Sequence, residues 1–211
     1  MHGTGDTELR QLMDAIAAGD DPAVRSLLAA SPPLARRALV AGATRADAAS
    51  NFLGSIARYV YAGDTALHVA AAAHQVPFAK ELIAGGADVA ARNRRGATPL
   101  HYAADGNPSA ANWNPSEQVR TILALADSGA DPNAADRGGV TPLHRAIRNR
   151  CAAAVRALLD SGADPLRANG SGSSPLMLAT GQTGRGGSGS AEAKAQQAEI
   201  VALLQGGASP G

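Results

Sequence analysis

Residues 141–172 read TPLHRAIRNRCAAAVRALLDSGADPLRANGSG and contain one complete structural unit. Thr141 is suited to cap a helix, since its hydroxyl can accept a hydrogen bond from a free backbone N–H, and Pro142 fits the first helical position. Gly162 supplies a left-handed residue that ends a second helix, and Asp164, followed by proline, prevents its continuation. Between these signals, apolar residues recur at helical spacing in two groups: Leu143, Ala146 and Ile147, then Val155, Leu158 and Leu159. The pattern predicts two short helices, each with one apolar face.

Neither apolar face can be buried within so small a unit, so the unit needs copies of itself on both sides. The sequence has similar helix starts, TALH, TPLH, TPLH and SPLM, at Thr65, Thr98, Thr141 and Ser174, and a GAD or GAS segment ends each unit. Two of the steps between starts are 33 residues long. This period, with T-P-L-H opening a helix pair and G-A-D closing it, resembles the ankyrin repeat. The resemblance implies an all-α fold, an ankyrin-repeat solenoid of about five stacked helix-turn-helix units with finger turns.

We expect one continuous domain with an unequal N-terminal part. Residues 1–64 are expected to form a capping helix pair, within 6–31, and then a helical insertion. The ankyrin repeats are expected in the remainder, at 65–97, 98–140, 141–173 and 174–211. Large apolar residues such as Leu123 and Leu158 are expected to fill the interfaces between repeats.

Residues 31–64 depart most from the family pattern, because only about a dozen residues usually separate ankyrin helix pairs. Two segments, Leu34–Val40 and Ala46–Tyr61, have helical spacing, with an apolar stripe of Phe52, Ile56, Tyr59 and Val60. By resemblance, an insertion at this place stands beside the concave groove. Two interpretations remain open: the insertion thickens the cap, or it takes part directly in binding.

Two further insertions interrupt the repeats, at residues 105–118 and 180–195. The first contains Trp113, and we expect both to project from one edge as mobile surface loops. The second contains GQTGRGGS, which has the glycine spacing of a phosphate-binding loop. However, Gly187 stands where that loop needs lysine, and no strand precedes it. A flexible loop is the favoured interpretation.

Composition limits the classes of function. The formal net charge is +1, so no overall field draws the chain to nucleic acid or to an anionic membrane. The single cysteine, Cys151, cannot form an internal disulfide and fits a reducing compartment. The sequence shows neither a signal-peptide pattern nor an apolar segment of the roughly 20 residues that span a bilayer. We expect a cytoplasmic, monomeric protein without membrane contact.

Histidines recur once per repeat, at His68, His101 and His144. The family resemblance implies that each serves structure by bonding to a finger turn. A helix-pair step of about 10 Å separates them, which is too far for shared metal ligation. Cys151, beside Arg150, is interpreted as a small buried hydrophobe and not as a reactive thiol. No paired carboxylates or nucleophile motif is present, so we expect no catalytic residues, no cofactor, no metal and no enzyme.

A binding role is better supported. By resemblance, ankyrin repeats bind through the finger residues before each T-P-L-H motif and through outward positions of each first helix. Carried over position by position, and with Trp113 added from the first loop insertion, this gives Tyr61, Asp64, Arg92, Arg94, Arg95, Tyr102, Asp105, Trp113, Arg137, Arg145 and Arg148. The arginines predict a basic patch for an acidic partner that also has an apolar element. Alternatively, they reflect a chain rich in arginine throughout.

Three functions are therefore compared. The resemblance favours a protein-interaction module that binds an acidic surface or peptide in the concave groove. A small-molecule-binding protein or unconventional enzyme that uses the groove and residues 45–64 is the first alternative. Nucleic-acid binding through the arginines is the second, and it is disfavoured because aromatic residues are only 3% of the chain and no nucleic-acid motif is present.

Overall fold

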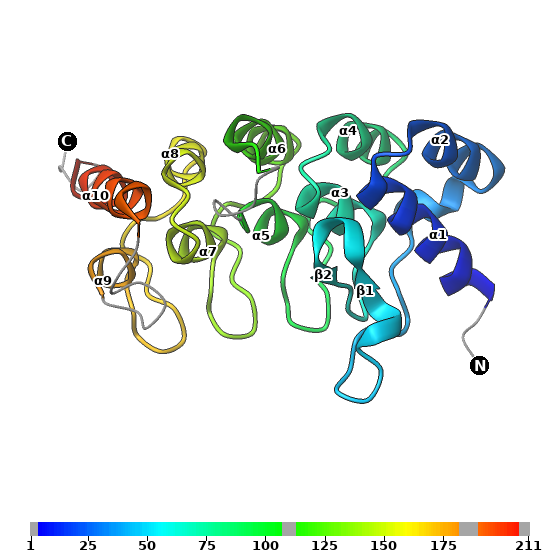
Figure 1. Ribbon diagram of the computed structural model, residues 1–211, viewed down its shortest axis with the longest axis horizontal. Helices are drawn as coiled ribbons and strands as arrows, with labels where there is room; N and C mark the ends of the chain where they lie inside the picture. The colour runs from blue at the N-terminus through cyan, green and yellow to red at the C-terminus, as the bar shows by residue number, and fades with distance from the viewer. Residues whose placement is uncertain (1–3, 107–112, 182–189, 207–211) are drawn as a thin grey trace.

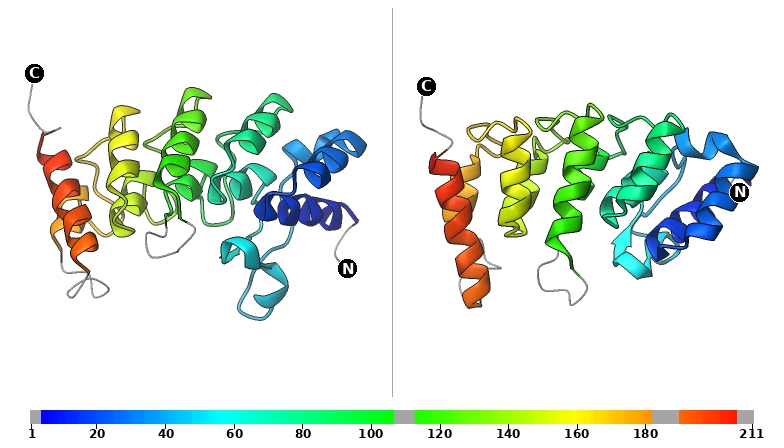
Figure 2. Two further views of the ribbon diagram at one scale, coloured as in Figure 1. Left: turned by 45° about the horizontal axis from the view of Figure 1, so that its top comes forward. Right: turned by 90° about the horizontal axis from the view of Figure 1, so that it is seen from above.

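The computed structural model describes residues 4–106, 113–181 and 190–206, which form a row of stacked helix pairs (Figure 1). The first helices of the pairs are α3 (Ala66–Ala72), α5 (Pro99–Ala103), α7 (Pro142–Arg148) and α9 (Pro175–Thr180). The second helices are α4 (Val76–Ala84), α6 (Pro115–Asp127), α8 (Ala152–Asp160) and α10 (Ala191–Gly206). The second helices lie side by side in one layer, and the finger loops extend beyond the layer of first helices (Figures 1 and 2). The predicted all-α solenoid is confirmed.

Three of the first helices, α3, α5 and α7, begin with the same pair of side chains, a threonine and a histidine. In α3, Nδ1 of His68 accepts a hydrogen bond from the backbone N–H of Thr65 at 3.1 Å, while Thr65 Oγ1 accepts from the His68 N–H. This leaves Nε2 of His68 to donate to the carbonyl of Ala97, 3.1 Å away in the next finger. His101 repeats the arrangement, with Nε2 2.9 Å from the carbonyl of Val140. His68 and His101 therefore cap their own helix and join it to the following repeat, and His144 caps α7 in the same way.

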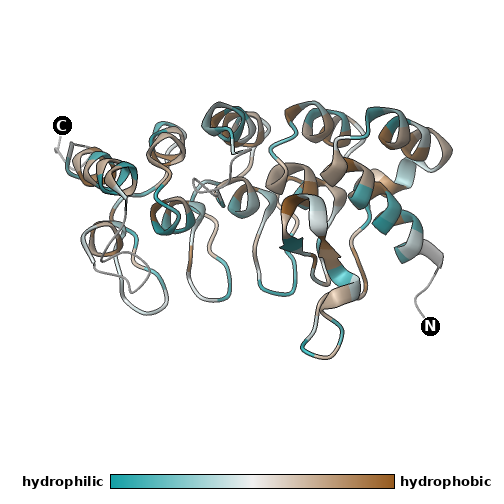
Figure 3. Ribbon diagram, in the orientation of Figure 1, coloured by the Kyte–Doolittle hydropathy of each residue, from teal (hydrophilic) through white to brown (hydrophobic). Residues whose placement is uncertain are grey.

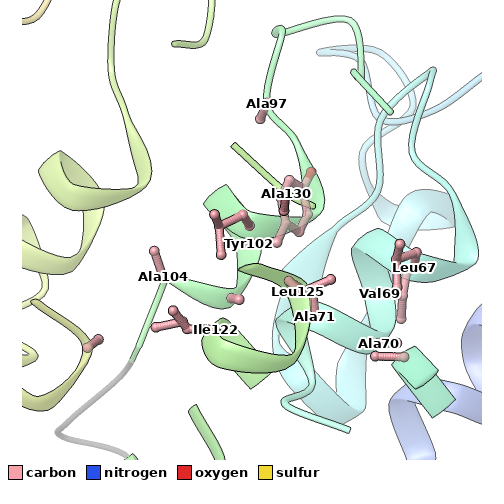
Figure 4. Packing of buried hydrophobic residues seen from close by; sticks show 14 of the residues in the cluster. Leu67, Val69, Ala70, Ala71, Ala97, Tyr102, Ala104, Ile122, Leu125 and Ala130 are labelled. Atoms are coloured by element: carbon pink, nitrogen blue, oxygen red, sulfur yellow. The ribbon is translucent and has the colours of Figure 1, made fainter. Parts of the chain in front are cut away.

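Apolar residues of successive repeats pack into one continuous core. Leu67, Leu100 and Leu143 occupy equivalent positions on the first helices and are fully buried. Figure 4 shows side chains of this cluster between α3, α5 and α6, and Figure 3 shows hydrophobic and hydrophilic positions alternating along the helices. On the second helices, Leu158 is buried as expected. The expectation for Leu123 is wrong, since its side chain is 38% exposed and its neighbours on α6 are buried instead.

The N-terminal end of the row is a helix pair, α1 (Thr4–Ala18) and α2 (Asp21–Ala30). Asp20 caps α2 by accepting a hydrogen bond from the N–H of Ala23 at 3.1 Å. One face of α1 packs towards α3 and buries its apolar residues completely: Leu9, Leu12, Met13 and Ile16.

The prediction of helices within residues 31–64 is wrong. The segment contains the short 3-10 helices η1 (Pro32–Arg36), η2 (Ala49–Asn51) and η3 (Gly54–Ile56), and a hairpin of strands β1 (Phe52–Leu53) and β2 (Arg58–Tyr59). Ala57 has a left-handed backbone, which turns the chain and pairs Phe52 with Tyr59. A helix is incompatible with this turn. The hairpin lies beside α3, and the loop before it extends on the side of the finger loops (Figure 1).

Residues 107–112 and 182–189 lie outside the described residues, and with them part of each loop insertion, including nearly all of the glycine-rich segment. The ends of both insertions are helical and not loops, since residues 115–118 belong to α6 and residues 191–195 belong to α10. At the last described repeat, Leu176 is 37% exposed, although its equivalents in α3, α5 and α7 are fully buried. Within the described ranges, none of the helices combines the length and apolar character needed to cross a membrane.

Candidate binding groove

A groove of about 550 Å³ lies between the hairpin and α7, over the finger that precedes α5. Its lining comes from the hairpin, from the finger loops, from α5 and the residue pair after it, and from α7 and its end. The lining residues are Ala57, Arg58, Tyr59, Tyr61, Asn93, Arg95, Ala97, Tyr102, Asp105, Asp136, Val140, Arg145, Arg148 and Asn149. Six of these are among the residues predicted from the sequence: Tyr61, Arg95, Tyr102, Asp105, Arg145 and Arg148.

Asp105 connects the two walls of the groove. Its Oδ2 atom accepts hydrogen bonds from Arg58 Nη1 and from Arg145 Nη1, both at 2.9 Å, and its Oδ1 accepts from Asn149 Nδ2 at 3.2 Å. Arg145 also contacts Oδ2 of Asp136 at 3.4 Å. All four charged side chains are mostly buried, so the ion pairs hold two guanidinium groups in fixed positions.

Asp64 and Tyr102 form the polar floor beneath these charges. The carboxylate of Asp64 is fully buried and accepts from Tyr102 Oη at 2.9 Å, from Asn93 Nδ2 at 2.9 Å and from the Tyr61 N–H at 2.7 Å. Burial, together with the Asp64 charge, raises the pKa of the Tyr102 phenol far above its ordinary value of 10.0. Both were expected to present contact surface to a partner. Instead, Asp64 is fully buried beneath the groove, and Tyr102 lines the groove with a side chain that is almost completely buried.

Tyr61 lies between two arginines at one side of the groove. The guanidinium carbon of Arg95 is 4.2 Å from the centre of the Tyr61 ring, and that of Arg94 is 5.1 Å away. Arg94 also donates to the carbonyl of Ala43 in the insertion. The ring therefore orients Arg95 towards the groove without neutralising its charge.

The other predicted residues lie apart from this cluster. Arg92 donates to the carbonyls of Gly96 and Ala135 at 3.0 and 2.7 Å, so it ties two fingers together. Arg137 is exposed on the next finger. Trp113 lines a different cavity of about 760 Å³, which it shares with His74, among other residues. The arginines thus divide into finger ties, ion-paired walls and exposed groups, and do not form one uniform patch.

Sequence reasoning missed Arg58 and Asp136. Asp136 occupies the finger position of Asn93 and Asn169, where the side-chain oxygen accepts two backbone N–H groups. An aspartate at this position has a second oxygen to spare, and that oxygen contacts Arg145. The aspartate at this position, where two other fingers have asparagine, was the sequence signal that could have indicated the contact with Arg145.

Several buried titratable groups have shifted pKa values because of their burial. Burial, reinforced by the Arg145 charge, lowers the pKa of His101 from 6.5 to about 4, and burial lowers the pKa of His68 and His144 as well. Burial raises the pKa of the Cys151 thiol to about 12, in keeping with the interpretation of a buried small hydrophobe. Among the described residues, no group of three or more histidine, cysteine, aspartate or glutamate side chains could hold a metal ion.

Comparison with known families gives a consistent result along the row. A model of ankyrin repeats in three copies matches residues 12–113, and a model of many ankyrin repeats matches residues 123–179. A model of the single ankyrin repeat matches residues 95–137. No curated protein sequence matches the chain significantly.

Proposed function

Because the chain belongs to the ankyrin-repeat family, whose repeats generally act as protein-interaction modules, we propose that its groove binds an acidic segment of a partner protein. Four arginines line the groove and only two aspartates oppose them, so the lining is basic although the chain as a whole is almost neutral: Arg58, Arg95, Arg145 and Arg148 against Asp105 and Asp136. A local excess of positive charge favours an anionic partner.

This proposal rests on one observation: two of the four groove arginines are ion-paired within the part of the chain that the structure describes, and the other two are not. Arg58 and Arg145 are held by Asp105, and their charges are offset by it. Arg95 and Arg148 are exposed, line the same groove, and form no ion pair with any described residue. Free guanidinium groups on a rigid support suit carboxylates, which they bind through two parallel hydrogen bonds.

Selection from a displayed library of random peptides tests the proposal. We expect the unaltered chain to enrich peptides rich in aspartate and glutamate, and their affinity to fall as ionic strength rises. The double variant Arg95→Glu/Arg148→Glu should lose this enrichment. Arg25→Glu is the matched control, because Arg25 is an exposed arginine on α2 whose only described ion pair is with Asp21.

The proposal fails if the unaltered chain shows no preference for acidic peptides. It also fails if the double variant and the unaltered chain select the same sequences. Circular dichroism of all three proteins would establish that the exposed substitutions leave the fold intact.

A further inference from the structure

The hairpin presents two aromatic side chains to solvent as a pair. Phe52 and Tyr59 are cross-strand partners, their ring centres are 4.9 Å apart, and they are 44% and 41% exposed. The chain has only two phenylalanines and three tyrosines, and it buries Phe78 and Tyr102 in the core. Two large apolar rings exposed together are a feature of contact surfaces, because aromatic residues contribute much of the binding energy at interfaces.

The aromatic pair stands on a rigid support. Leu53 and Val60, next to it in sequence, are buried. Before β1, Asn51 Oδ1 accepts from Arg10 of α1 at 2.5 Å, and its carbonyl accepts from the Val60 N–H at 2.9 Å. In β2, Arg58 is bound to Asp105 across the groove. The hairpin is therefore anchored on both sides, so little conformational entropy would be lost when a partner packs on its rings.

The aromatic pair is also continuous with the groove. Tyr59 is one of the groove residues, and it follows Arg58 directly in β2. Phe52 extends the apolar surface from Tyr59 towards α1, where it borders a small cavity with Met13. An acidic segment lying in the groove would thus reach an apolar surface at the hairpin.

We propose that the Phe52–Tyr59 pair is the apolar half of the binding surface and receives a large aliphatic or aromatic side chain of the acidic segment in the groove. The inference rests on the proposed function. It assigns to the partner a definite chemistry: aspartate or glutamate residues next to one large apolar residue. The positive charge of the groove and its continuity with the aromatic pair both favour this occupant over a partner that presents an apolar surface without acidic residues.

The test repeats the selection of random peptides with Phe52→Ser/Tyr59→Ser. The unaltered chain should enrich acidic peptides with a large apolar residue at a fixed place relative to the acidic ones. The double variant should still enrich acidic residues but lose the apolar preference. Val40→Ser is the matched control, since Val40 lies in the same insertion, is 83% exposed and is absent from the groove.

A double-mutant cycle with one selected peptide then measures the contact. Replacing the peptide's apolar residue by alanine should weaken binding to the unaltered chain about tenfold, which corresponds to about 1.4 kcal/mol, and have little effect on the double variant. An unchanged apolar preference in the double variant would overturn the inference, as would acidic peptides without any apolar preference. If acidic residues themselves are not enriched, the proposed function fails first. Thermal unfolding of each variant shows whether the hairpin substitutions have disturbed the fold.

Discussion

Arg145 of α7 and Asp105, which follows α5, form an ion pair at 2.9 Å that links two neighbouring repeats across the groove. The same carboxylate oxygen also accepts from Arg58 of the hairpin, so one aspartate joins three parts of the chain. Two of these three groups, Asp105 and Arg145, were expected from the sequence to contact a partner, but they hold the walls of the groove together. Arg145 is consequently a poor choice for testing binding by charge reversal.

Arg145→Glu should destabilise the fold, whereas Arg148→Glu should not. The first substitution places a third carboxylate beside Asp105 and Asp136 and removes their shared cation. We expect a loss of about 2 kcal/mol or more in the free energy of unfolding, since a hydrogen bond to a charged group is worth about 1.5–3 kcal/mol. Arg148 is exposed and has no ion pair with a described residue, so its reversal should change stability by about 0.5 kcal/mol at most. Urea unfolding of both variants measures the difference.

Tyr102→Phe should cost about 1–3 kcal/mol, because the hydroxyl is one of three donors to the buried carboxylate of Asp64. Tyr59→Phe removes the same hydroxyl from an exposed ring and should be nearly neutral. Denaturant midpoints of the two variants provide the comparison. Equal stabilities of the two variants would show that the hydrogen bond from the Tyr102 hydroxyl to Asp64 does not stabilise the fold.

The repeat architecture could be predicted because its signals are local. Thr65 and His68 are three residues apart, and the cap they form needs no information from elsewhere in the chain. The family pattern then places the finger residues and the outward positions of the first helices. For that reason Arg95 and Arg148 could be assigned to a groove from the sequence, and their role in binding stays a prediction.

The hairpin and the ion pairs could not be predicted, since they depend on distant contacts. The spacing of Phe52, Ile56 and Tyr59 suits a helix as well as a hairpin. The choice is made by anchors such as Arg10 to Asn51, which are 41 residues apart in the chain. Asp105 likewise meets Arg145 only when two repeats stack, which the sequence of either repeat alone does not reveal.

Leu143→Ala and Leu176→Ala compare one repeat position in two environments. Leu143 is fully buried between repeats, and its truncation should cost about 2–5 kcal/mol. Leu176 is 37% exposed at the last described repeat, so its truncation should cost about 1 kcal/mol or less. Thermal or urea unfolding of the two variants measures both losses of stability. A similar loss at both positions would imply that the face carrying Leu176 is covered in solution.

Gly63→Ala should lower the free energy of unfolding more than Gly162→Ala, although both glycines have a positive φ, +86° and +91° respectively. A Cβ at Gly162 would meet nothing within 4 Å, so the substitution should cost only the left-handed backbone penalty of about 1–2 kcal/mol. A Cβ at Gly63 would lie 2.7 Å from Asn93 Cα, where the two fingers touch. We expect about 1–3 kcal/mol of additional loss in the free energy of unfolding from this crowding. Equal losses would mean that the fingers can separate at no cost.

The buried histidines should make the fold less stable in mild acid. Burial, with the nearby charge of Arg145, holds the pKa of His101 at about 4, whereas the ordinary value is 6.5. Between these values the unfolded chain binds a proton that the folded chain does not, so unfolding becomes easier as the pH falls from about 6.5 to about 4. Each such histidine contributes a slope of up to about 1.4 kcal/mol per pH unit, and burial shifts the pKa of His68 and His144 in the same direction.

Urea unfolding at about pH 7 and about pH 5 measures this slope. His101→Gln removes one titrating group, so the variant should be less stable at neutral pH yet show a shallower dependence on pH than the unaltered chain. A cap that merely lost its hydrogen bonds would lower stability equally at both pH values, which separates the two effects. If the free energy of unfolding of the unaltered chain stays constant or rises towards pH 5, the histidines are not held neutral by the stacked repeats, and the capping role assigned to them is wrong.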